Sequence, residues 1–265
     1  MNAYQTRSML TPAVKNLLIL NCLCFLPTLF QSLGQQGFDL DQWAGLHYWQ
    51  SDKFNIFQLV SYMFLHGSLE HLFCNMLAVF MFGVVIERAW GTRKFLFFYF
   101  VTGIGAAITQ EVIWSFEWKQ LVDAVNLAAN TGDGSLLEPY YDKLAQYFSF
   151  SGQLSHFPTH ELTRLQGLFT EGITDRLVTI GASGAVFGLL LAFGWLFPDA
   201  ELMLLFFPIP IRARIFVTLY ALVELFAGVS NFSGDSVAHF AHLGGMIFGA
   251  LLLTYWKKKG MLYDD

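Results

Sequence analysis

The chain has 265 residues and a formal net charge of −5; 55% of its residues are hydrophobic and only 13% are charged. In an ordinary soluble domain about a quarter of the residues are charged. This composition therefore excludes an ordinary soluble domain and indicates a membrane-embedded bundle. The acidic balance, with no extended basic run before Lys257–Lys259, argues against a nucleic-acid partner. Cys22, Cys24 and Cys74 lie in apolar runs, which is typical of small hydrophobic residues and not of a disulfide framework or a metal site.

Six apolar segments approach the length of about 20 residues that a helix needs to cross a bilayer. The fourth is short for a full crossing, which suits a helix that begins below the membrane surface. No small-residue cleavage site follows the first, so we expect an anchor and not a removed signal peptide. The sequence predicts an all-α, polytopic membrane protein with one membrane domain over 1–265 and six transmembrane helices at about 13–33, 64–86, 93–113, 181–197, 203–227 and 237–256.

The basic residues predict how these spans are oriented, because cytoplasmic loops carry an excess of lysine and arginine. With a cytoplasmic N-terminus, ten of the fifteen basic residues fall in short inside segments and five in the much longer outside segments. We therefore expect both termini to be cytoplasmic. The inside group is Arg7, Lys15, Arg88, Arg93, Lys94, Arg212, Arg214, Lys257, Lys258 and Lys259, and the outside group is Lys53, Lys119, Lys143, Arg164 and Arg176.

One long hydrophilic stretch, at about 114–178, separates the third and fourth predicted spans. Its segments LVDAVNLAA (121–129) and YYDKLAQYF (140–148) have the pattern of short amphipathic helices, and NTGDGS (130–135) has the composition of a loop. We expect this stretch to be an extracytoplasmic insertion in the membrane domain.

Several polar side chains are predicted to lie at membrane depth, where they are costly and usually functional. Spans two, four and six all enter from the outside in the predicted topology. His71 then lies about seven residues into span two, Ser183 at the head of span four, and His242 about five residues into span six, all within roughly 10 Å of the outer ends of their helices. The polar residues at this depth are His71, Asn75, Ser183, Glu224, His239 and His242.

Two pairs of glycines predict which of these helices meet, because G-x-x-x-G spacing lets membrane helices approach closely. His242 precedes the second pair by three and seven residues and shares its stripe. If spans four and six meet along the glycines, Ser183 and His242 come within hydrogen-bond reach as nucleophile and general base. The pairs are Gly184 with Gly188 and Gly245 with Gly249.

An oxyanion formed at Ser183 would need hydrogen-bond donors. The backbone N–H of Ser183 is one candidate, since the first N–H groups of a helix have no intrahelical partner. His71 and Asn75, four residues apart on one helix face, are two others. We expect no acid to be required, because Phe187, one turn beyond Ser183, could stabilise the charge on His242 by aromatic packing.

Three segments of the chain resemble motifs of the rhomboid family of intramembrane serine proteases. They are GASGAVFG (181–188) with Ser183, AHLGGMIFG (241–249) with His242, and HGSLEHLFCN (66–75) with His71 and Asn75. The resemblance implies a six-helix bundle with a serine–histidine dyad that opens to the outside, and no cofactor or metal. It also implies that the partners are the lipid bilayer and transmembrane protein substrates, which are cleaved near the top of their helices.

The chain departs from the family pattern at two residue positions and in its insertion between spans three and four, which is longer than in the simplest bacterial members. The first loop usually has Trp-Arg or Trp-Gln where this chain has Phe57-Gln58, which alters its lipid-facing anchor. Many members have tyrosine at the position of Phe187, and phenylalanine retains the stacking on the histidine while it lacks the hydroxyl. We expect Gly181 to let the chain turn into the helix of Ser183, and we expect a multi-pass protein of a bacterial plasma membrane.

Alternatives remain for several of these residues and for the activity. His239 is the main rival of His242 as the base, Glu224 is expected to hydrogen-bond to the loop at 228–236, and His66 is expected to fix the first loop. A metalloprotease would need a His-Glu-x-x-His motif or a similar ligand set, and that motif is absent. A proteolytically inactive membrane chaperone or transporter is the non-enzymatic alternative.

Overall fold

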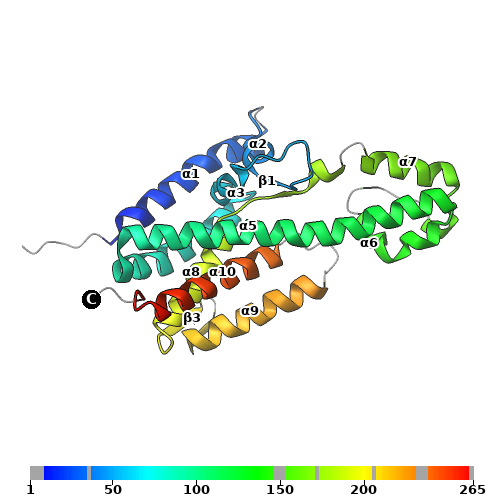
Figure 1. The fold of residues 1–265 in the computed structure, drawn as a ribbon. Coiled ribbons are helices and arrows are strands. Elements are labelled where there is room, and N and C mark those ends of the chain that lie inside the picture. The colour runs from blue at the N-terminus through cyan, green and yellow to red at the C-terminus, as the bar shows by residue number, and fades with distance from the viewer. Residues whose placement is uncertain are drawn as a thin grey trace, which may run out of the picture.

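A long helix, α5 (Val84–Thr131), runs the length of the molecule and organises the other elements (Figure 1). Helix α1 (Pro12–Ser32) packs against one side of it. Helices α8 (Ser183–Leu196) and α10 (His239–Lys258) pack against the other, with α9 (Ala213–Ser230) outside them (Figure 1). The computed structural model describes residues 9–34, 37–145, 148, 153–170, 173–204, 207–230 and 238–262.

The second and third predicted spans follow each other almost without a loop. Helix α4 (Leu69–Ala78) continues through a π-helical turn, η2 (Val79–Gly83), into α5. The helix direction changes at Gly91, whose φ of 73° and ψ of 161° lie outside the helical region. Such positive φ angles are readily adopted only by glycine, so Gly91 provides the turn between the two predicted spans.

The helix of the third predicted span extends well beyond residue 113, where that span is predicted to end. The helix continues to Thr131, about 60 Å beyond the Gly91 turn at 1.5 Å per residue, or twice the thickness of a bilayer core. Residues 121–129, predicted to be a separate short helix, are the last turns of α5. No glycine or proline interrupts 114–131, and α5 ends at Gly132, whose φ is 72° and whose N–H donates to the Ala128 carbonyl.

The rest of the predicted insertion packs on this extension of α5. Its elements are η3 (Gly134–Tyr140), α6 (Tyr141–Ala145), η4 (Leu154–His156), α7 (Thr159–Thr170) and η5 (Ile173–Arg176). They share a small apolar core that is separate from the core of the main bundle. This core includes Trp118, Leu121, Leu137, Leu144, Leu154 and Leu162. The unit lies at the opposite end of the molecule from the C-terminus (Figure 1).

The described residues also contain two small antiparallel sheets, so the all-α prediction is wrong in this detail. Strand β1 (Leu46–His47) pairs with β2 (Val178–Thr179), and β3 (Glu201–Leu204) pairs with β4 (Phe207–Arg212). The second sheet occupies the start of the predicted span 203–227. Proline disrupts a helix interior, and β4 contains two prolines, so the helix begins only after them, at Ala213.

Short helices complete the loop between α1 and α4. They are α2 (Leu40–Ala44), α3 (Gln58–Ser61) and the 3₁₀ turn η1 (Tyr62–Phe64). The Gln58 side chain is buried and ties this loop together, since it accepts from the backbone of His47 and Asn55 and donates to the carbonyls of Trp43 and Lys53. The neighbouring Phe57 is 77% exposed. The departure at Phe57-Gln58 therefore keeps one apolar outward residue and one polar inward residue.

Several helices have the composition of membrane spans. Three helical stretches of the described chain are long and apolar enough to cross a bilayer: Pro12–Ser32, Leu69–Thr131 and Ala213–Ser230. Helix α8 is apolar but has only 14 residues, and α10 falls outside this group because His239, His242 and its basic end lower its hydropathy. The protein is thus a mostly helical membrane protein with several apolar helices, and the count of six spans stays a prediction.

Candidate active site

Ser183 is the first residue of α8, and a turn connects this helix to strand β2. The turn depends on Gly181, whose φ is 136°, a value that residues with a side chain rarely adopt. Its N–H donates to the Tyr62 carbonyl over 2.9 Å. As the first helical residue, Ser183 has a backbone N–H with no acceptor inside the helix. This N–H group and the Ser183 hydroxyl are therefore together at a helix N-terminus.

The two glycine motifs do not both face the same helix. A Cβ at Gly245 of α10 would lie 2.8 Å from the carbonyl carbon of Gly184, so α8 and α10 meet backbone to backbone at this point. A Cβ at Gly188 would instead collide with Thr102 of α5, and one at Gly249 would touch side chains of both α5 and α8. The predicted contact between α8 and α10 is thus made by Gly245 against the Gly184 backbone. A Cβ at Gly184 itself would collide with Ala106 of α5, so Gly184 and Gly188 both serve the packing of α8 on α5.

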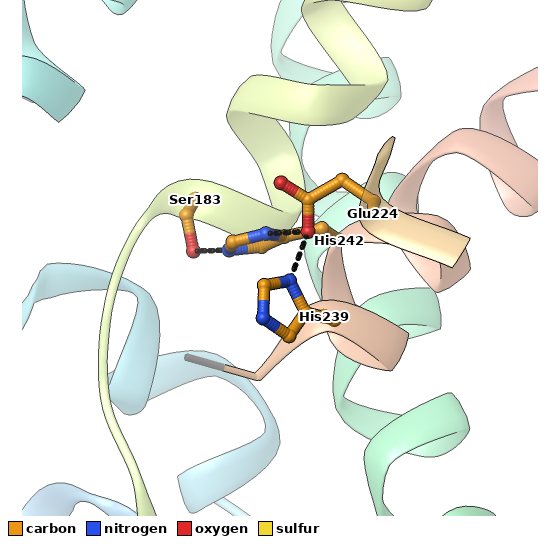
Figure 2. A network of polar contacts seen from close by, with 4 residues as sticks. All are labelled: Ser183, Glu224, His239 and His242. Carbon is orange, nitrogen blue, oxygen red and sulfur yellow. Dashed lines mark hydrogen bonds and ion pairs between the residues drawn. The ribbon is translucent and has the colours of Figure 1, made fainter. Parts of the chain in front are cut away.

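The close approach at Gly184 and Gly245 brings Ser183 and His242 together. Ser183 Oγ lies 2.8 Å from His242 Nε2, within hydrogen-bond distance (Figure 2). The imidazole is buried and stacks on the ring of Phe187, with 4.2 Å between ring centroids and 9° between planes. The residue pair that the sequence predicts to be nucleophile and base is thus hydrogen-bonded, and the predicted aromatic contact lies on one face of the imidazole.

Glu224 makes a contact that the sequence does not predict. Its Oε2 accepts from Nδ1 of His242 at 2.9 Å and from Nδ1 of His239 at 2.7 Å (Figure 2). The expected bond to the loop at 228–236 cannot be assessed in full because residues 231–237 lie outside the described residues. The sequence signal for this contact is a glutamate at predicted membrane depth, but the residues around it form no motif that indicates a histidine partner. His242 therefore has an acidic partner, and the expectation that no acid is required stays a prediction.

His71 lies beside the nucleophile. A Cβ at Gly181 would be 2.9 Å from His71 Nε2 and 3.6 Å from Ser183 Oγ, so the imidazole edge and the hydroxyl flank one point. Asn75, one turn further along α4, is buried and donates from Nδ2 to the His71 carbonyl over 3.0 Å. His66 is also buried and packs edge-on against His71, with ring centroids 4.9 Å apart. The His71 imidazole of α4 thus lies beside Ser183, with His66 packed against it.

The same histidines bear on the metalloprotease alternative. Within the described residues, Glu224, His239 and His242 have ligand atoms that all lie within 4.8 Å of one another. Carboxylate and imidazole groups are ligands that zinc accepts. Both Nδ1 atoms are already satisfied by one carboxylate oxygen, however, so these residues fit a hydrogen-bonded network without an ion. The absence of a metal stays a prediction.

A comparison with protein families supports the resemblance inferred from the motifs. The family described as "Rhomboid domain" matches residues 53–116 and 148–259, which is about two thirds of the chain. The chain belongs to the rhomboid family. The matched ranges contain Ser183, His242, His71, Asn75 and Glu224, whereas residues 117–147 of the helical extension lie outside them.

Curated rhomboid proteins match across most of this chain. A mitochondrial rhomboid protein of Schizosaccharomyces pombe is 26% identical over 80% of this chain and 56% of the relative. Mitochondrial rhomboid protein 1 of Saccharomyces cerevisiae is 27% identical over 76% of this chain and 42% of the relative. The rhomboid protease AarA of Providencia stuartii is 28% identical over 72% of this chain and 52% of the relative.

This rhomboid chain thus spans about half the length of the curated relatives it matches. The relatives include mitochondrial and bacterial proteins, so their names do not select one membrane. As a rhomboid with several apolar helices, the protein is a multi-pass membrane protein. The predicted bacterial plasma membrane stays a prediction.

Proposed function

We propose that this rhomboid is an intramembrane serine protease that cleaves peptide bonds of transmembrane proteins. The observation that carries the proposal is the 2.8 Å contact between Ser183 Oγ and His242 Nε2, with the serine at a helix N-terminus. A distant relative, the rhomboid protease of Providencia stuartii, carries the same activity in its name. Hydroxyl, base and helix N-terminus together are the parts that acyl transfer to serine requires.

In the proposed reaction, Ser183 Oγ attacks the scissile carbonyl while His242 Nε2 takes its proton. His242 then returns that proton to the leaving amine as the carbon–nitrogen bond breaks and an acyl-enzyme forms. Water next attacks the acyl group, with the same imidazole as base, and releases the serine. The Ser183 N–H and the side chains of His71 and Asn75 donate to the oxyanion in both steps.

We further infer that the substrate reaches Ser183 from the outer half of the bilayer, past α9. The proposed topology has six spans in one membrane domain, cytoplasmic termini and an extracytoplasmic insertion at about 114–178. It is supported by the basic residues and by the position of the insertion at the end opposite the C-terminus (Figure 1). Bilayer lipid is then the immediate partner of α9, whose exposed side chains include Leu219, Leu222, Val223 and Leu225.

The test is cleavage of a model transmembrane substrate by the full chain in liposomes. Wild type should cut the substrate, and Ser183→Ala and His242→Ala should each abolish the cut. A fluorophosphonate should label wild type but not Ser183→Ala, and a chelator should leave the rate unchanged. Full activity in Ser183→Ala would overturn the proposal, and loss of activity in chelator would favour the metalloprotease alternative.

A further inference from the structure

Glu224 is the buried carboxylate that α9 contributes to the site. Its side chain points from α9 across to α10, and one of its oxygens contacts both histidines of that helix (Figure 2). The residue is only 5% exposed, whereas most of α9 presents exposed apolar side chains. Burying a carboxylate costs free energy unless hydrogen bonds compensate for the lost hydration. The position of Glu224 therefore indicates a functional role.

We propose that Glu224 is a positioning residue for His242, so that the site works as a Ser–His–Glu triad and not as a dyad. The inference rests on the proposed protease function and deepens it. In this arrangement Glu224 contacts neither substrate nor the reacting atoms. It acts through the far nitrogen of the imidazole that serves Ser183.

The first support is the tautomer that the two contacts impose on His242. To serve as the base for Ser183, Nε2 must carry the lone pair, and a neutral imidazole then carries its hydrogen on Nδ1. That nitrogen lies 2.9 Å from Glu224 Oε2, an acceptor for the hydrogen. The Glu224 contact therefore selects the tautomer that leaves Nε2 free to accept from Ser183 Oγ.

The second support is the charge that the reaction creates. When His242 takes the serine proton it becomes an imidazolium, buried among apolar helices where water cannot stabilise it well. Phe187 offers the face of a neutral ring, but Glu224 offers a negative charge directly on the Nδ1–H. Charge-assisted hydrogen bonds of this kind are about twice as strong as neutral ones, so the carboxylate favours the charged state.

His239 helps to define the state of Glu224. Its Nδ1 lies 2.7 Å from the same Oε2 that contacts His242. Because Glu224 Oε2 accepts from both N–H groups, it has no hydrogen of its own to donate to either histidine. The arrangement therefore fits an ionised carboxylate. The second donor also limits rotation of the carboxylate away from His242.

The competing interpretation is that Glu224 only fastens α9 to α10. Helix α9 has other contacts for that purpose, since Val217 packs against Gly194 of α8, and Gly228 lies against His239 and Phe240 of α10. A fastening role predicts weaker substrate binding or lower stability when Glu224 is changed. A positioning role predicts a slower chemical step with unchanged substrate binding.

The two interpretations are separated by the kinetics of Glu224→Gln in liposomes. Glutamine keeps the shape but replaces the anion by an amide with a single acceptor oxygen. We expect kcat to fall by roughly 10²- to 10⁴-fold with KM unchanged, and Glu224→Asp to recover part of the loss. Glu111→Gln is the matched control, because Glu111 is also a buried carboxylate but accepts from the Trp49 backbone N–H, and it should retain wild-type kcat.

Wild-type kcat in Glu224→Gln, or a change in KM alone, would overturn the triad while leaving the protease function intact. An inactive wild type, or an active Ser183→Ala, would instead overturn the protease function. If Glu224→Gln fails to fold, ¹⁵N spectra of wild type labelled at histidine decide the matter. They should show His242 with its hydrogen on Nδ1, and a hydrogen on Nε2 in the resting enzyme overturns the inference.

Discussion

Gly245 of α10 rests directly on the backbone of Gly184 of α8, so close that a Cβ on Gly245 would overlap the Gly184 carbonyl group. Gly184 directly follows Ser183, and Gly245 lies three residues, or nearly one turn, after His242. The contact therefore sets the distance between the serine hydroxyl and the imidazole.

Gly245→Ala should separate the two helices and reduce cleavage strongly. Backbone cannot move aside as a flexible side chain can, so we expect a loss of about 1–3 kcal/mol in the free energy of unfolding. A displacement of about 1 Å between catalytic groups can cost roughly 10²-fold in rate. Gly167→Ala on α7, where a Cβ meets open space, is the control and should leave cleavage unchanged. Wild-type cleavage by Gly245→Ala would show that this contact does not set the site.

Much of the candidate site could be predicted because its parts follow helix geometry. The predicted topology places His71, Ser183 and His242 at similar depth in helices that run in one direction, and glycine spacing indicates a close contact between two of these helices. These relationships depend only on residue spacing and topology. The stacking of Phe187 on His242 follows in the same way, since it lies one turn beyond Ser183.

The rest depends on features that residue spacing does not determine. The contact from Glu224 to His242 requires a particular rotation of α9, and a helix with apolar residues on most sides does not reveal which face points inward. The sequence predicts a span over residues of β3 and β4 because most of them are apolar, whereas in the structure the two strands pair in a sheet. Residue patterns do not reveal the full length of α5, because hydrophilic residues end the apolar run near 113 and the helix over 121–129 is predicted as a separate element.

Phe187→Ala should destabilise the protein and slow catalysis, because Phe187 fills the space between His242 and Tyr220. Removing a buried phenylalanine ring costs about 3–5 kcal/mol. Phe187→Tyr should keep the stacking and most of the activity. Thermal unfolding in detergent and kcat in liposomes test both variants. Normal kcat in a folded Phe187→Ala protein would mean that the ring does not hold the imidazole.

Glu87→Ala should lower stability through the start of α1. The Glu87 carboxylate accepts from the backbone N–H groups of Ala13 and Val14 at 2.9 and 3.0 Å, so it caps a helix distant in sequence. Each buried donor left without an acceptor costs about 1–3 kcal/mol. Denaturant unfolding in detergent measures the loss. Glu70→Ala, which removes an exposed acidic residue in the first turn of α4, should cost less, and equal losses would argue against the cap.

Asp41→Asn should make stability less dependent on pH. Burial and the nearby charge of Asp39 raise the pKa of Asp41, partly offset by a contact with the Thr28 hydroxyl. A pKa that is higher in the folded state means that stability falls as pH rises through the range where Asp41 ionises. Asp41→Asn should therefore unfold at a higher temperature than wild type at pH 7, with the advantage shrinking toward pH 4. Asp52→Asn is the exposed control, and an equal gain there would contradict the explanation.

His71→Ala and Asn75→Ala should each lower kcat while substrate binding stays the same. Both side chains are proposed to donate to the oxyanion, which exists only after Ser183 attacks, and loss of one such donor costs roughly 10²–10³-fold in kcat. His160→Ala, at an exposed position of α7, is the matched histidine control. Cleavage rates over a range of substrate concentrations separate kcat from KM. Because Ser183 and His242 remain in both variants, a rise in KM with normal kcat would place His71 and Asn75 in substrate binding and not in the oxyanion hole.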